Sequence, residues 1–421
     1  MTTRSMRAGF WAAALGLVWL SLSTSVFAVS DLPLIDAVRA GDVEKVRSLL
    51  AQQADPNTPD HDGTTALHWA AHRDDVESAE SLLAAGARVG VANRYGATTV
   101  LVAATNGSAA MLTLLLDAGA DPNVGLPEGE TPLMRTARAG RVDAVQVLLA
   151  HGADVDAREG WRGQTALMWA AANDNAAAIH VLAEQGAHLH VRTDNPSRSP
   201  GRTFSSTPAT GFTPLLFAVR GGHLDAARVL LDAGADVNDA VSDGQSGLVV
   251  AAANANWEMA AYLLDRGADP THAGAGWNAL HQTVRTRRMN VGFGTRGPFA
   301  AGTLDSIDLV RQLLARGVDV NARMTRNGIR DGQRNRFNRL GATAFMLAAK
   351  VTDVETMRVL LEAGADPLIP TADGTTPLMV AAGLAIWNPG EDGGTLSGQE
   401  DEVLEAARIC LELGNDANAA N

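Results

Sequence analysis

One pattern of apolar and polar positions recurs along the chain with a period of about 33 residues. Each copy begins with a polar residue, continues through apolar and small residues, and reaches a pair of leucines before a Gly-Ala-Asp turn or a close variant of it. The pattern predicts two short helices per copy, one after the polar start and one that carries the leucines. The polar starts are Thr65, Thr98, Thr131, Thr165, Thr213, Ser246, Asn278, Thr343 and Thr376.

The distances between these starting positions show how regular the repeat is. Four of the eight spacings are 33 residues, one is 32 and one is 34. The two large spacings, 48 and 65 residues, indicate insertions after Thr165 and Asn278. A fixed period of about 20 to 50 residues is typical of solenoids and related arrays. We therefore expect one long repeat array in place of several unrelated domains.

The residue types at each position fit a pair of helices. Threonine or serine accepts a hydrogen bond from the first helical turn, and the proline that often follows, such as Pro132 or Pro214, has no amide hydrogen to leave unsatisfied. Glycine after the second helix can adopt the left-handed conformation that ends a helix. One pair cannot bury its own apolar face, so stacked neighbours must supply the core.

Two stretches carry the clearest family resemblance. Residues 65–71 are Thr-Ala-Leu-His-Trp-Ala-Ala, and Thr213-Pro214-Leu215 is followed by Gly222-His223. The chain resembles the ankyrin repeat family from about Asp31 to Asn418. The tetratricopeptide repeat has a similar period, but the Thr-Pro-Leu start and the Gly-Ala-Asp turn are in the wrong places for it. The resemblance implies an all-α solenoid of about ten helix–turn–helix units with β-hairpin-like loops.

The register of the repeat sets the expected domains. We expect a signal peptide over 1–28 and a single array over 29–421, with capping units at both ends. The units are predicted near 31–63, 64–96, 97–129, 130–163, 164–211, 212–244, 245–276, 277–341, 342–374 and 375–421. The insertions are predicted at 194–210, 286–304 and 322–340. Long loops inside compact arrays are usually functional or disordered.

The N-terminus predicts export of the chain. Arg4 and Arg7 precede an apolar stretch over 8–22, and Val26-Phe27-Ala28 fits a cleavage site. We expect a secreted protein of the periplasm of a Gram-negative bacterium, without stable membrane insertion once the signal is cleaved. The alternative is an uncleaved helix that anchors the chain in the inner membrane, but serines and a threonine weaken that reading.

Composition and charge narrow the picture further. Hydrophobic residues make up 46% of the chain and aromatic ones only 5%, as thin and closely stacked helical layers require. The single cysteine, Cys410, excludes an intrachain disulfide. The net charge of −13 argues against generic binding to nucleic acid. Removing Arg4 and Arg7 with the signal peptide leaves 32 basic and 47 acidic residues, a net charge of −15.

The acidic total hides one basic segment. Residues 277–341 contain 12 arginines and four aspartates, which gives this unit a charge of +8 and the rest of the mature chain −23. The arginines could fold onto the acidic units of the same chain, dock an acidic partner, or lie in a solvated loop. Arginine favours fixed bidentate contacts with carboxylate or phosphate. The docking hypothesis includes Arg330, Arg334 and Arg336.

The resemblance also predicts which surface binds a partner. Hairpin tips and the ends of first helices face partners in ankyrin arrays. Large aromatic residues at hairpin positions could bind a partner or pack between neighbouring hairpins, and basic residues at helix ends could form a binding row or a solvated face. The register assigns Tyr95, Trp161, Arg162, Phe212 and Trp277 to the hairpins and Arg73, Arg138, Arg220, Arg285 and Lys350 to the helix ends.

Candidate chemistry is sparse. His68 and His281 occupy a position of the resembled family at which the imidazole organises the turn. His188-Leu189-His190 has no evident third metal ligand, and we expect Trp69 and Trp169 in the core and Cys410 buried and inert. The sequence contains no nucleophile elbow, phosphate-binding loop or zinc-protease motif. We therefore expect neither an enzyme nor a bound metal or cofactor.

The favoured function is a non-catalytic protein–protein interaction scaffold of the bacterial envelope. It would bind a protein partner through the concave face and the Arg-rich loops, and the arginines fit an acidic partner. We expect no binding to nucleic acid. We expect a monomer. One alternative is a binder of an envelope polyanion, such as lipid phosphate or acidic glycan. Another is an accessory subunit of a periplasmic enzyme.

Overall fold

The computed structural model of the chain describes residues 32–194, 210–288, 302–327, 337–383 and 400–420. The predicted signal peptide at 1–28, with its alternative as a membrane anchor, lies outside these residues. Most of the predicted insertions at 194–210 and 286–304, and residues 328–336 of the third, also lie outside them. Within the described ranges, no helix has the length and hydropathy that crossing a bilayer requires.

Twenty helices in the described residues form ten antiparallel pairs. The first helices of the pairs, the inner helices, are α1 (Pro33–Ala40), α3 (Ala66–Arg73), α5 (Thr99–Asn106), α7 (Pro132–Arg138), α9 (Ala166–Ala171), α11 (Pro214–Gly221), α13 (Gly247–Ala253), α15 (Ala279–Arg287), α17 (Ala344–Lys350) and α19 (Pro377–Ala381). The second, outer helices are α2 (Val43–Ala51), α4 (Val76–Ala84), α6 (Ala109–Asp117), α8 (Val142–Ala150), α10 (Ala176–Glu184), α12 (Leu224–Asp232), α14 (Trp257–Asp265), α16 (Ser306–Ala315), α18 (Val354–Glu362) and α20 (Glu400–Glu412).

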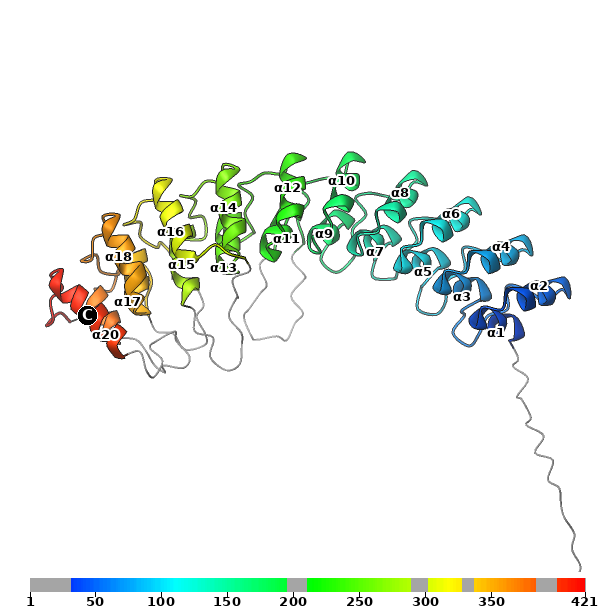
Figure 1. The fold of residues 1–421 in the computed structure, drawn as a ribbon, viewed down its shortest axis with the longest axis horizontal. Coiled ribbons are helices and arrows are strands. Elements are labelled where there is room, and N and C mark those ends of the chain that lie inside the picture. The colour runs from blue at the N-terminus through cyan, green and yellow to red at the C-terminus, as the bar shows by residue number, and fades with distance from the viewer. Residues whose placement is uncertain (1–31, 195–209, 289–301, 328–336, 384–399, 421) are drawn as a thin grey trace, which may run out of the picture.

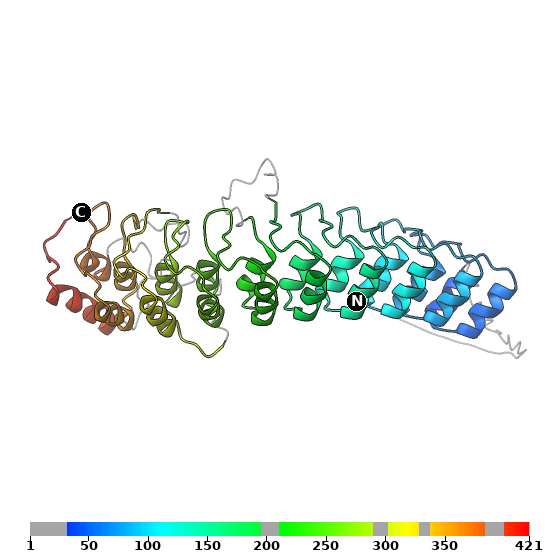
Figure 2. The ribbon, with the colours of Figure 1, turned by 90° about the horizontal axis from the view of Figure 1, so that it is seen from above.

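The pairs stack side by side into a curved solenoid (Figure 1). The inner helices lie along the concave side of the curve and the outer helices along the convex side. Figure 2 shows that the loops between successive pairs gather along one edge of the array. In the described residues there are no strands, only isolated bridges such as Ala92 with Thr98. The predicted all-α solenoid is therefore confirmed.

The local chemistry predicted for the helix ends is present. The Thr98 hydroxyl oxygen accepts a hydrogen bond from the Leu101 amide, and Thr213 does the same for Leu216. Gly107 ends α5 in the left-handed conformation, with φ of 71°, a value that a residue with a Cβ adopts at a cost. The threonine caps fix the residue at which an inner helix begins, and the left-handed glycine fixes the residue at which α5 ends.

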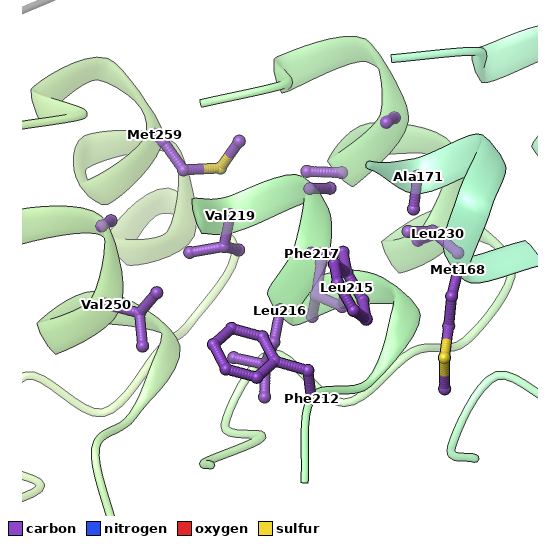
Figure 3. Packing of buried hydrophobic residues seen from close by; sticks show 14 of the residues in the cluster. Met168, Ala171, Phe212, Leu215, Leu216, Phe217, Val219, Leu230, Val250 and Met259 are labelled. Atoms are coloured by element: carbon purple, nitrogen blue, oxygen red, sulfur yellow. The ribbon is translucent and has the colours of Figure 1, made fainter. Parts of the chain in front are cut away.

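Small apolar residues make the close stacking possible. Ala103 and Ala104 on α5 and Ala170 and Ala171 on α9 have no exposed surface. Larger apolar side chains fill the space between units, as Figure 3 shows around Leu216. Cys410 is buried, as predicted, and burial raises the pKa of its thiol to about 11. A protonated thiol is a poor nucleophile.

Asparagine side chains join successive loops of the array. The Asn57 amide donates to the Gly86 carbonyl and its oxygen accepts from the Arg88 amide, at 3.0 Å and 2.8 Å. Asn123 makes the equivalent pair of bonds to Gly152 and Asp154 in the next unit. The same side-chain type therefore fixes one unit relative to the next at repeated positions.

One long connection escaped the sequence analysis. The inner helix α19 ends at Ala381 and the outer helix α20 begins at Glu400, so 18 residues join the last pair, as many as join α15 to α16 across the predicted insertion at 286–304, whereas the other pairs are joined by only a few. The residues between 384 and 399 lie outside the described part of the chain. The last polar start in the sequence is Thr376, so no later spacing between starts could reveal this insertion.

Candidate partner-binding surface

The exposed helix ends of the concave side carry arginine in several units. Arg73, Arg138 and Arg220 are exposed at the ends of α3, α7 and α11, as the register predicts. Arg39 occupies the same position near the end of α1 and is also exposed. The sequence analysis missed Arg39 because the first unit lacks the polar start that defines the register elsewhere.

Asparagine side chains from the following unit fix two of these helix ends. The Asn175 amide donates to the carbonyl oxygens of Ala137 and Arg138, at 2.9 Å and 2.8 Å. Asn256 donates in the same way to Val219 and Arg220, at 3.1 Å and 3.0 Å. The backbone that carries each arginine is therefore held in place before any partner arrives.

Aromatic residues lie beneath two of the arginines. The Arg138 guanidinium is 5.0 Å from the centre of the Trp169 ring, and the Arg39 guanidinium is 4.5 Å from that of Trp69. Both indoles pack against the core but stay half-buried, which corrects the prediction of a core position. Each tryptophan lies four residues after the polar start of its unit. A side chain at that position faces the concave side, and the indole therefore stays partly exposed.

The loop before α9 presents a second aromatic group. Trp161 is 73% exposed, and the Arg162 guanidinium lies 5.4 Å from the centre of its ring. The buried Glu159 carboxylate accepts hydrogen bonds from the backbone amides of Trp161, Arg162 and Gln164, at 2.5, 2.8 and 2.9 Å. The predicted residues Trp161 and Arg162 thus sit on a loop that an internal acid holds in shape.

Arg220 completes this central part of the concave side. Its guanidinium lies 4.9 Å from the centre of the Phe212 ring and 5.1 Å from that of Phe217. Phe212 is only 7% exposed and packs against Phe217, so its predicted role as a partner contact is wrong (Figure 3). Partial burial, together with the nearby charge of Arg162, lowers the pKa of Arg220.

The predicted row does not continue into the later units. Trp277 is 8% exposed and Lys350 is 4% exposed, with its ammonium 5.9 Å from the centre of the Phe337 ring. Arg285 is half-buried, and burial lowers its pKa to about 10. Phe337 lies beside Lys350, and next to Trp277 the Thr325 amide donates to the Gly276 carbonyl at 2.8 Å. Both side chains are buried, so the prediction of accessible partner contacts is wrong for both.

Tyr95 lies on an earlier loop and stays accessible. It is 58% exposed, and the Arg94 guanidinium donates to its hydroxyl at 2.6 Å while also pairing with Asp62 at 2.8 Å. The predicted exposure is therefore present at Tyr95 and Trp161 but not at Phe212 or Trp277.

Two arginines of the basic unit pair within the chain. Arg287 contacts the Asp305 and Asp353 carboxylates, both at 3.0 Å, and also Glu355. Arg288 donates two hydrogen bonds to Glu402, at 2.5 Å and 3.1 Å. Of the readings given for the Arg-rich segment, these contacts favour folding onto acidic units of the same chain. The predicted contacts Arg330, Arg334 and Arg336 lie outside the described residues.

The histidines singled out in the sequence have structural contacts. His68 Nδ1 accepts from the Thr65 amide at 3.2 Å and its Nε2 lies 3.2 Å from the Ala97 carbonyl of the next unit. His281 Nε2 lies 3.0 Å from the Ala322 carbonyl. The predicted turn-organising role is confirmed for both. In the described part of the chain, no three His, Cys, Asp or Glu side chains form a group that could hold a metal ion.

Comparison with known proteins settles the family. The model of ankyrin repeats in three copies matches residues 34–125, 100–193, 200–274 and 299–386, which together cover more than half of the chain. The chain belongs to the ankyrin repeat family. Members generally mediate protein–protein interactions, and their fold is typically a binding scaffold without catalysis.

Several relatives share the repeats over part of their length. The mitochondrial disaggregase of Bos taurus is 29% identical over 175 residues, which are 42% of this chain and 22% of that protein. The nuclear factor NF-kappa-B p105 subunit of Gallus gallus is 32% identical over 176 residues, 41% of this chain and 15% of that protein. The solved human ASB11 ankyrin repeat domain is 26% identical, with a TM-score of 0.47, over 56% of this chain and 99% of that domain. The chain thus spans less than a quarter of the two relatives named first.

Proposed function

We propose that this ankyrin repeat protein is a non-catalytic scaffold of the bacterial envelope that binds a partner protein through its concave side. The observation that carries the proposal is the set of exposed arginine and aromatic side chains on backbone that hydrogen bonds hold in place. Arg138, Trp161 and Arg220 are the central members of the set. A preformed surface loses little conformational entropy on binding, which leaves more of the contact energy as affinity.

The envelope location rests on the pattern of residues 1–28. A positively charged start, an apolar stretch and the small residue Ala28 are the features that signal peptidases and the export machinery recognise. Fractionation of cells that produce the chain, followed by mass spectrometry of its N-terminus, tests this part. We expect a periplasmic protein that begins at Val29, whereas an intact N-terminus in the membrane fraction would support the anchored alternative.

Protein binding is tested by affinity purification from an envelope extract. We expect Trp161→Ala to reduce recovery of the main partner by about tenfold, because truncation of an exposed interface tryptophan commonly costs more than about 1 kcal/mol. Leu404→Ala is the matched control, since Leu404 is an apolar side chain 69% exposed on the outer helix α20. Equal recovery with wild type and Trp161→Ala would contradict the proposed surface.

A polyanion of the envelope is the second candidate ligand, and the cationic helix ends at Arg138 and Arg220 favour it. Salt separates the two candidates because exposed charge contacts are screened over about 10 Å at 0.1 M ionic strength. Binding that vanishes with modest salt and survives Trp161→Ala would favour lipid phosphate or acidic glycan. Binding that persists in salt and depends on Trp161 would favour a protein.

A further inference from the structure

Arginines on the two sides of the array differ in their ion pairing. Each arginine within an outer helix has a carboxylate within 4.0 Å, namely Arg47, Arg228, Arg311, Arg358 and Arg408. Two arginines of inner helices also pair with carboxylates, Arg135 with Glu130 and Arg287 with Asp305, both at 3.0 Å. Among the described residues, no carboxylate lies within 4.0 Å of the inner-face arginines, which we define as Arg39, Arg73, Arg138, Arg162 and Arg220. This set of cations therefore has no counter-charge from the described part of the chain.

Helix geometry explains only part of this arrangement. A cation near the last turn of a helix interacts favourably with the helix dipole, which accounts for single arginines at the ends of α1, α3, α7 and α11. Arg162 is different, because it lies on the loop before α9. Burial lowers the pKa of Arg220, a residue two predicted units further along, and the positive charge of Arg162 lowers it further. Two cations kept close together raise the energy of the free protein.

The acid nearest to Arg162 in sequence cannot relieve this repulsion. Glu159 is 7% exposed, and its oxygens accept the backbone hydrogen bonds that shape the Trp161 loop. Asp194, whose backbone amide donates to the Arg162 carbonyl at 2.8 Å, pairs with Arg158 at 3.0 Å. An anion supplied from outside the chain would therefore gain attraction from Arg162 and Arg220 without having to displace either of these acids.

Aromatic surface separates the cationic centres. Trp169 lies under Arg138, Trp161 lies under Arg162, and Phe217 lies under Arg220. Phe217 is only 6% exposed, so a ligand that follows this surface meets the cationic heads together with the rings of Trp161 and Trp169. A polymer of phosphates carries the same charge at every unit, but a peptide can alternate acidic and apolar side chains. Arginine and tryptophan are also the residue types enriched in protein–protein hot spots.

We infer that the surface formed by Arg138, Trp161, Arg162, Trp169 and Arg220 binds an acidic segment of a partner protein, in which Asp or Glu alternates with apolar side chains. The inference rests on the proposed function and adds the chemistry of the bound segment to it. The carboxylates pair with the guanidiniums, in bidentate geometry where the approach allows it, and the apolar side chains cover the exposed ring faces. The bound segment supplies the counter-charge that the described residues of the chain do not place beside these arginines.

A selection from random 12-residue peptides displayed on phage tests the inference with the mature full-length chain as the target. Enriched peptides are synthesised with a fluorescent label and titrated by fluorescence anisotropy against three proteins. These are the wild type, the inner-face variant Arg138→Gln/Arg162→Gln/Arg220→Gln, and the outer-helix variant Arg228→Gln/Arg358→Gln/Arg408→Gln. Both variants lose three positive charges, so a difference between them reports position and not net charge.

We expect enriched peptides to be rich in Asp and Glu with interspersed apolar residues. The inner-face variant should raise their Kd by about 100-fold and the outer-helix variant by less than about threefold, since each lost exposed charge contact weakens binding by up to roughly fivefold and three such losses multiply. Circular dichroism melts of both variants should match the wild type, because all six side chains are on the surface.

The other outcomes are distinguishable. Enriched peptides without acidic residues, or with affinity that both variants retain, would overturn the acidic segment while leaving protein binding in place. Failure to enrich any peptide, together with binding of labelled heparin or polyphosphate that the inner-face variant loses, would overturn the peptide ligand and the proposed function together. Failure of every probe to bind would overturn both as well.

Discussion

At the scale of single residues, burial decides the chemistry of the titratable groups that do not face the solvent. His281 lies at the start of α15 between its own turn and the chain of the next loop. Burial lowers its pKa from 6.5 to about 4, because a charged imidazole would lose hydration that its backbone partners do not replace. The folded state therefore holds the neutral ring over a pH range in which the unfolded chain binds a proton.

This difference predicts that stability falls as the pH drops from 6.5 to 4. Above pH 6.5 the ring is neutral in both states, and the full contribution is present. As the pH falls through the unfolded pKa of about 6.5, the unfolded chain takes up a proton that the folded chain refuses until about pH 4. The shift corresponds to about 3 kcal/mol in the free energy of unfolding between these limits.

Urea unfolding of wild type and His281→Gln at pH 7 and pH 5 measures this effect. The variant will be less stable at pH 7, because it loses packing and hydrogen bonds, but its stability should change less between the two pH values. His68 shows a pKa shift in the same direction and remains in both proteins, so it cancels in the comparison. Equal pH dependence in the two proteins would refute the assignment to His281.

At the scale of helices, a group of charged side chains around the buried Asp353 ties the last units together. Arg287, at the end of α15, reaches Asp305 before α16 and also Asp353 and Glu355 at the start of α18. Arg288 connects the same Asp353 to Glu402 on α20, at 3.7 Å and 2.5 Å. Asp353 has no exposed side-chain surface and also caps α18 through the Thr356 amide. Units eight, nine and ten are therefore linked by side chains as well as by stacking.

Removing one partner of such a group leaves a buried charge without compensation. We expect Arg287→Gln to lower the local free energy of unfolding of units nine and ten by about 3 kcal/mol. Hydrogen exchange of α17 and α18 amides measures this, and α3 and α5 amides should keep their protection because contacts in a solenoid are mainly between neighbours.

Arg311→Gln is the matched control for this prediction. Arg311 pairs with Asp308 within α16 at 3.4 Å, and both side chains are more than half exposed. Its loss should change protection by less than about 0.5 kcal/mol, as is usual for surface pairs. A similar loss of protection in the two variants would show that the buried group contributes no more than a surface pair.

At the scale of the whole molecule, the sequence alone predicts the array well because every unit repeats the same solution. Thr98, Thr131 and Thr213 cap their inner helices where the period places them. The binding surface is harder to predict, because register says which way a side chain leaves its helix but not what later folds over it. Trp277 and Lys350 fit the register of a partner contact, yet both are buried, with Phe337 beside Lys350 and the Thr325 amide bonded to the Gly276 carbonyl next to Trp277.

The misplaced residues share one physical cause. Trp69 and Trp169 looked like core positions by sequence, but the concave side leaves them half open beneath arginines. Phe212 looked like a hairpin contact, but Phe217 lies next to it and supplies a better apolar neighbour than solvent. Contacts that the repeat consensus does not specify decide such cases. They can lie within one unit, as between Phe212 and Phe217, or join two units, as between Arg39 and Trp69, and the period of about 33 residues does not predict them.

The central claim is that the concave side around Trp161 is the surface that meets a partner protein. A photo-crosslinking amino acid placed at Trp161 in living cells tests it most directly, with the same amino acid at Leu404 as the control on the outer helix α20. We predict that irradiation yields a discrete protein adduct from position 161 and that the adduct weakens when Arg138, Arg162 and Arg220 are changed to Gln. An adduct that forms equally from position 404, or no protein adduct from position 161, would contradict the claim.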